Sequence, residues 1–198
     1  MLGVLTGIAA GAAAFALCAL LRWLPSSAAA KALLGAYLVL SGAWAGFRWT
    51  QLSQQMQAAI AAVTAEKVAA VTGHFLPREG TASGKMSEQE GESIVREATE
   101  KTLGGILPPQ DTSALGDALV GEAAGRRLAD RDGYIKRERM RRYLYTEVPD
   151  ILEVRLQAMA DNRRTRLFAA AFILLLIGVT AGAFARQLGR GERLEETA

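Results

Sequence analysis

Residues 167–185 read LFAAAFILLLIGVTAGAFA, nineteen residues without a charged side chain between Arg166 and Arg186. At about 1.5 Å rise per residue, a helix of this length crosses most of a hydrocarbon core about 30 Å thick. None of the five prolines of the chain falls inside this stretch. The stretch is therefore predicted to be a transmembrane helix.

Two further apolar stretches lie near the N-terminus. Leu2–Leu21 carries no charge over twenty residues, and Ala32–Phe47 carries none over sixteen. The second is short, but Ala28–Ala30 can lengthen it, and the flanking Lys31 and Arg48 can extend their charged ends towards water. Together the three stretches predict an integral membrane protein of the all-α class.

The charges lie mainly in the middle of the 198-residue chain. From Glu66 to Arg166, basic and acidic residues number 17 each, so this part has no net charge. A nucleic-acid-binding surface needs an excess of Lys and Arg, and we therefore expect no nucleic-acid partner. The predicted division is a two-span hairpin (1–48), a helical extramembrane domain (49–166), a third transmembrane helix (167–186) and a short polar tail (187–198).

Apolar residues at steps of three and four border the middle part on both sides. They are Leu52, Met56, Ala59 and Val63 on one side, and Leu152, Leu156 and Met159 on the other. Such spacing is typical of helices that pack along one face. Because both series continue into transmembrane stretches, they predict an antiparallel helical stalk built from extensions of the second and third membrane helices.

Shorter helices are expected between the two arms of the stalk. Ser87 and Glu90 form a capping box that opens a helix to about Leu103. A second helix is expected from Asp111 or Ser113 to about Asp130, and a basic helix from Tyr134 to about Tyr145. No alternation of polar and apolar residues indicates strands, so residues 49–166 are predicted to be helical throughout.

Glycines spaced four residues apart occur in all three apolar stretches. They are Gly3, Gly7, Gly11, Gly42, Gly46, Gly178 and Gly182. Small residues at this spacing line one helix face and let two helix backbones approach closely. The pattern predicts tight helix packing, and it fits packing inside one chain as well as packing between copies in an oligomer.

Two groups of basic residues suggest contacts with lipid or a partner. Arg48, Arg163, Arg164, Arg166 and Arg186 lie next to the apolar stretches and are expected at lipid headgroups. The second group is Lys136, Arg137, Arg139, Arg141 and Arg142. This second group fits either a surface for anionic lipid or an acidic partner, or a solvated helix whose residues Ile135, Met140, Tyr143 and Leu144 pack inward.

Residue types that carry chemistry are sparse. His74 is the only histidine and Cys18 the only cysteine, so a catalytic or metal role for either lacks partners of the same kind. Cys18 is expected to pack as a small apolar residue rather than to carry a lipid. Asp130, Asp132 and Gly133 resemble part of a calcium loop, but the later ligands are missing, and a turn is expected. We expect no enzymatic activity, no metal and no cofactor.

The basic residues at the ends of the apolar stretches predict an orientation. Arg22, Lys31, Arg186, Arg190 and Arg193 would share one side of the membrane, which the positive-inside rule places in the cytoplasm. The middle part is then outside the cytoplasm of a bacterial inner membrane, although the cluster 163–166 opposes this. Cleavage of the first stretch as a signal peptide is an alternative, disfavoured because no basic residue precedes the apolar run.

These features favour a scaffold or anchor subunit of a larger envelope complex, such as secretion or conjugation machinery, with lipids and other membrane subunits as partners. Two alternatives are an extracytoplasmic sensor module and a homo-oligomeric pore. For the sensor, the helical arm that passes through arginines into a membrane helix, Leu152–Leu188, resembles the sensor regions of bacterial chemoreceptors and sensor kinases. That resemblance implies signalling to a separate partner, because no output domain follows in this sequence.

Overall fold

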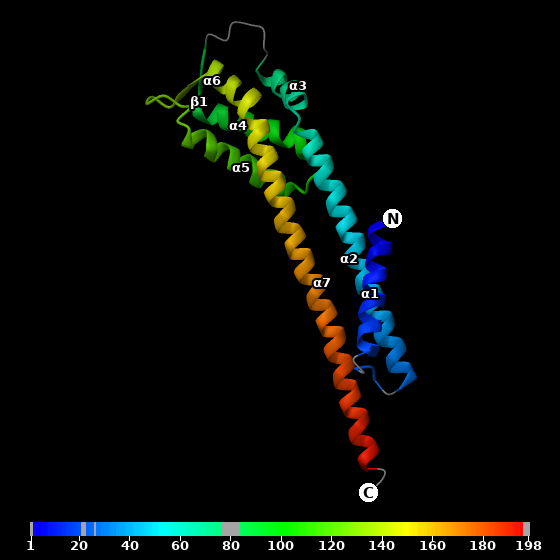
Figure 1. Ribbon diagram of the computed structural model, residues 1–198. Helices are drawn as coiled ribbons and strands as arrows, with labels where there is room; N and C mark the ends of the chain where they lie inside the picture. The colour runs from blue at the N-terminus through cyan, green and yellow to red at the C-terminus, as the bar shows by residue number, and fades with distance from the viewer. Residues whose placement is uncertain (1, 21–22, 26, 77–83, 196–198) are drawn as a thin grey trace. The chain divides into compact units, whose positions relative to one another are not determined.

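The computed structural model describes residues 2–20, 23–25, 27–76 and 84–195 (Figure 1). Almost all of them lie in helices, as expected for an all-α protein. The helices are α1 (Leu2–Leu20), α2 (Ala28–Ala62), α3 (Ala65–Phe75), α4 (Glu88–Leu103), α5 (Pro109–Gly125), α6 (Arg137–Arg142) and α7 (Val148–Glu195). A π-helical turn, η1 (Tyr143–Glu147), joins α6 to α7, and the strands are β1 (Lys85–Ser87) and β2 (Tyr134–Lys136).

Three helical segments of the described chain are long and apolar enough to cross a membrane: Gly3–Leu20, Ala28–Ala62 and the continuous helix Arg137–Gln187. This agrees with the membrane protein predicted from the sequence. Large apolar side chains point outward from them, including Leu20 at 81%, Leu33 at 72% and Phe168 at 63% exposure. An apolar exterior of this kind suits hydrocarbon rather than water.

The chain forms two compact units. One consists of Met1–Ser53 and Asp161–Ala198, and the other of Gln54–Ala160. We call the first the membrane unit, because it contains all three apolar stretches, and the second the middle unit. The long helices α2 and α7 contribute residues to both units.

In the membrane unit, α1 and α2 run antiparallel with their glycines in contact. A Cβ atom on Gly7 would collide with the carbonyl oxygen of Gly42, and one on Gly46 with that of Gly3. On α7, a Cβ on Gly178 would lie 2.8 Å from Tyr37 Cε1. The Tyr37 hydroxyl donates a hydrogen bond of 3.0 Å to the Leu174 carbonyl, which satisfies a polar group among apolar neighbours.

The middle unit has its own apolar core. Its most deeply buried side chains are Met56, Met86, Val95, Leu103, Leu119, Met140, Tyr143, Leu144, Leu152 and Leu156. Both apolar series predicted from the sequence contribute to this core. Met56 and Ala59 on α2 and Val63 directly after it are buried, as are Leu152 and Leu156 on α7. Helix α4 packs on α5, and the Arg96 guanidinium reaches Asp117 across the two helices at 3.0 Å.

The prediction that residues 49–166 are helical throughout was wrong in one place. Strands β1 and β2 pair antiparallel, with Met86 opposite Ile135. Both central residues are buried and their neighbours exposed. A strand of three residues shows a single apolar position, which is too little for an alternation to be visible in the sequence.

Several helix boundaries also differ from the expected ones. The basic helix begins at Arg137, because Tyr134–Lys136 form β2. Helix α5 begins at Pro109, which suits the first helical position, and ends at Gly125, well before Asp130. The helix start at Ser87 is confirmed, since the Glu90 backbone N–H donates to Ser87 Oγ at 3.1 Å, which is the N-cap half of the predicted capping box.

Candidate interaction site of the middle unit

A pocket of about 460 Å³ opens in the middle unit beside α4 and α5. Its apolar lining consists of Gly91, Val95, Val120, Ala123, Ala124, Leu128, Ala129, Ile135 and Met140. Its charged lining consists of Glu88, Glu92, Arg127, Asp130 and Arg131. The volume is in the range of ligand-binding pockets in proteins, and an apolar floor with charges at the rim suits an apolar group carried by a polar partner.

Gly91 sets the depth of the pocket floor. A Cβ atom at this position would lie 2.6 Å from Met140 Cε and 2.9 Å from Ile135 Cδ1. The missing side chain therefore lets α6 and β2 pack directly against α4. Ile135 and Met140 are both buried, so the floor is part of the core and is held in place by it.

The rim contains the only described non-glycine residue with a positive φ, Arg127 at 53°. The Arg127 N–H donates to the Ala124 carbonyl at 3.0 Å, and the Leu128 N–H to the Ala123 carbonyl at 3.4 Å. This pair of bonds is a Schellman motif, which ends α5 and usually has glycine at the left-handed position. An arginine here costs conformational energy that a glycine would not.

We expect Arg127→Gly to raise the stability of the full chain by about 0.5–1 kcal/mol, because glycine adopts the left-handed conformation without strain. Thermal unfolding in mild detergent measures the change. Arg127→Ala is the matched control, since it removes the same charge but keeps a Cβ. Equal stabilisation by both variants would contradict the conformational explanation and point to charge repulsion instead.

Polar contacts join α4, α6 and the loop that carries the rim. Arg139 on α6 contacts Asp130 at 3.3 Å, and Arg137 contacts Glu90 on α4 at 3.6 Å. The Glu88 backbone N–H donates to the Gly133 carbonyl at 3.1 Å. Gly133 has φ 74°, so the turn expected at Asp132–Gly133 is present.

The basic residues between Lys136 and Arg142 are mainly exposed, and the apolar residues among and after them are buried. Lys136, Arg137, Arg139 and Arg142 are exposed, while Arg141 is partly covered. Ile135, Met140, Tyr143 and Leu144 are buried, at 1–4% exposure. The inward apolar face is therefore present, and Arg139 contacts the rim residue Asp130. The exposed arginines fit both a solvated helix and a surface for anionic lipid or an acidic partner.

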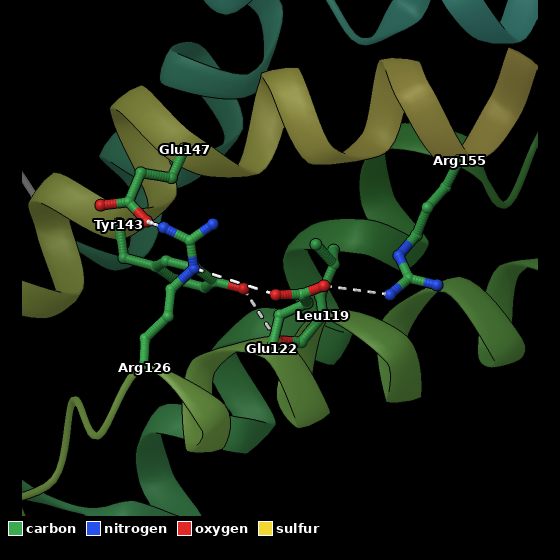
Figure 2. Close-up of polar contacts among 6 residues, drawn as sticks. All are labelled: Leu119, Glu122, Arg126, Tyr143, Glu147 and Arg155. Atoms are coloured by element: carbon green, nitrogen blue, oxygen red, sulfur yellow. Dashed lines mark hydrogen bonds and ion pairs between the residues drawn. The ribbon is translucent and has the colours of Figure 1, made fainter.

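Figure 2 shows a polar network around Tyr143. Two of its members, Glu122 and Arg126, adjoin the pocket-lining residues Ala123 and Arg127 in the chain. The Tyr143 hydroxyl donates 2.8 Å to the Leu119 carbonyl, and both residues are buried. The Arg126 guanidinium pairs with Glu147 of η1, and Arg155 of α7 reaches the Glu122 carboxylate at 3.3 Å. The network joins α5 to η1 and α7.

Burial raises the pKa of Tyr143 to about 12, and the nearby Glu122 carboxylate acts in the same direction. A buried phenolate would lose its hydration without gaining a donor, because the hydroxyl is itself the donor to Leu119. This network was not predicted from the sequence. Only the Glu122–Arg126 pair could have been predicted, because these residues are four positions apart. Glu147 and Arg155 are distant from them in the chain.

The histidine and the cysteine singled out from the sequence are not part of the pocket lining. His74 is exposed near the end of α3, with its ring 5.7 Å from that of Phe75. Cys18 is buried at 3% exposure. In the described part of the chain, His, Cys, Asp and Glu side chains form no group able to hold a metal ion.

The arginines next to the apolar stretches belong to the membrane unit. Arg48 is exposed and reaches Gln51 at 3.4 Å, and Arg166 is exposed. Arg163, Arg164 and Arg186 are half-buried, and Arg164 contacts Asp161 at 3.4 Å. The contact of these arginines with lipid headgroups stays a prediction.

The chain matches no protein-family model, no curated protein and no solved structure.

Proposed function

We propose that this chain is a non-enzymatic membrane subunit that anchors a larger envelope assembly, and that its middle unit holds a segment of a partner protein. The observation that carries the proposal is the pocket between α4, α5 and the loop before β2, with its apolar floor and charged rim. An apolar side chain of a partner would fill the floor, and polar groups around that side chain would meet Glu88, Glu92 and Arg131. Buried anchor side chains surrounded by polar rims are typical of protein interfaces.

The strain at Arg127 supports a role for the rim. Unfavourable backbone conformations of this kind concentrate at binding sites, where they hold a side chain in place for a ligand. An arginine presented from the left-handed position projects from the end of α5 beside the pocket. Arginine is also among the residues enriched at protein interfaces.

A pocket-filling variant tests the proposal. Ala124 is exposed and lines the pocket, whereas Gly125 is the next residue, lies outside the lining and has open space around it. We expect Ala124→Trp to fill the pocket and reduce partner binding at least about tenfold, and Gly125→Trp to leave it unchanged. The measurement is native mass spectrometry of full-length protein purified in mild detergent from its own membranes.

A monodisperse wild-type chain without any bound protein would contradict the anchoring proposal. The compartment of the bound protein also checks the orientation that we propose from the basic residues near the apolar stretches, with the middle unit outside the cytoplasm. A partner that resides in the cytoplasm would reverse that orientation.

The same pocket favours a second candidate function, a sensor module that binds a small amphipathic ligand and signals to a separate partner. The pocket lies between the helices of the middle unit, where a sensor would hold its ligand. One ligand-stabilisation assay distinguishes the two candidate functions. A small molecule that stabilises the wild type but not Ala124→Trp, with no protein bound, supports the sensor.

A further inference from the structure

A second cavity, of about 550 Å³, lies in the membrane unit, lined by parts of α1, α2 and α7. Small residues form much of its wall, among them Gly7, Gly11 and Gly42. Trp49 and Phe168 also line it, and their ring centroids are 5.0 Å apart. The cavity is therefore an apolar space in the membrane unit with an aromatic pair in its wall.

A cationic group with unused hydrogen-bonding capacity stands beside this aromatic pair. Arg164 precedes Phe168 by one turn of α7, and its guanidinium lies 5.6 Å from the centre of the Trp49 ring. Its Nη1 contacts Asp161 at 3.4 Å, but its Nε–H is buried and has no hydrogen-bond partner among the described residues. The Arg164 side chain is 41% exposed, so its guanidinium can also accept a contact from an anionic oxygen outside the chain.

We propose that the membrane unit binds one anionic phospholipid, with an acyl chain in the cavity and the phosphate at Arg164. The two ends of the site suit groups of opposite polarity. The cavity wall is almost entirely apolar, whereas Arg164 needs an anionic oxygen acceptor, and a phospholipid provides both in one molecule. Arginine binds phosphate strongly because its N–H groups form charge-assisted hydrogen bonds.

The existing partner of Arg164 does not compete strongly with a phosphate. Asp161 is 75% exposed at its side chain, and an exposed pair three residues apart on one helix contributes little. A membrane helix of a second copy could also cover the cavity. The apolar stretches that such a copy would offer to the cavity contain no acidic residue, so the charge of Arg164 favours the lipid.

The test compares lipid retention by the full chain in nanodiscs. One set contains phosphatidylcholine alone, and the other contains phosphatidylcholine with phosphatidylglycerol, which is anionic. Native mass spectrometry after release from the nanodisc counts the lipids that stay bound. We expect one phosphatidylglycerol to stay bound to the wild type in preference to phosphatidylcholine.

Two variants and one control identify the site. Arg164→Gln removes the cation and is expected to lower phosphatidylglycerol retention at least about tenfold. Ala171→Phe fills the cavity from α7 and is expected to lower the retention of both lipids. Arg166→Gln is the matched control, because Arg166 lies on the same helix, is exposed and is not part of the cavity lining.

Three outcomes would overturn the proposal. Equal retention of the two lipids by the wild type would mean that no anionic site exists. Equal losses in Arg164→Gln and Arg166→Gln would mean general attraction of lipid by the arginines. A lipid-free dimer that Ala171→Phe converts to a monomer would assign the cavity to a second copy. Circular dichroism of each variant checks that the helices are intact.

Discussion

We expect Gly42→Ala to destabilise the packing of α1 on α2 by about 1–3 kcal/mol, the usual cost of overfilling a well-packed contact. A Cβ atom on Gly42 would collide with the carbonyl oxygen of Gly7 and lie 3.2 Å from the backbone nitrogen of Gly11. Both neighbours are backbone atoms of a helix, which cannot rotate away as a side chain can. The two helices must therefore separate along this face.

Gly35→Ala is the matched control on the same helix. A Cβ atom at Gly35 would lie 3.3 Å from the Phe15 ring, which is a side chain that can move by a few tenths of an ångström. The measurement is unfolding of the full chain in mixed micelles of mild detergent and SDS, followed by circular dichroism. Equal stability of the two variants would show that the glycine contact between α1 and α2 does not form in the membrane unit.

The second large effect is expected at alkaline pH and depends on Tyr143. Its pKa is about 12 in the folded chain, against an ordinary value of 10. Between pH 10 and 12 the unfolded chain therefore loses a proton that the folded chain keeps, which favours unfolding as the pH rises. The stability present below pH 10 should fall by about 2–3 kcal/mol across this window.

Tyr143→Phe separates this effect from the titration of lysines, because it removes one phenol and no amine. We expect the wild type to lose more stability than the variant between pH 10 and 12, in thermal unfolding of the full chain. In an absorbance titration, the variant should lack a tyrosine that ionises near pH 12. Identical pH profiles of the two proteins would contradict the buried position of the Tyr143 hydroxyl.

The sequence was most informative where one physical effect dominates. Runs of uncharged residues such as 167–185 can satisfy their backbone in hydrocarbon only as helices, so the helical class followed directly. Ser87 predicted the start of α4 because a cap depends on residues three positions apart. The apolar positions of the basic helix were also visible, since Met140 and Leu144 are spaced four apart on one helix face.

The candidate site was not visible in the sequence, because it depends on contacts between distant segments. Gly91 reads as an ordinary helix-interior glycine until Met140 and Ile135 are seen to pack over it. The left-handed conformation of Arg127 has no sequence signal, since glycine is the usual residue there. The strand pair also depends on distance, because Met86 and Ile135 meet only when the intervening helices have folded.

The pairing of β1 with β2 has a consequence for the order in which the middle unit folds. The two strands close a loop of about 50 residues that contains α4 and α5, and closing a flexible loop of that length costs about 3–4 kcal/mol of chain entropy. Helices α4 and α5 are neighbours in sequence and can pair locally and early. Pairing of these helices brings the ends of the loop closer together. We therefore expect the strand pair to form after the helices and to complete the pocket floor last.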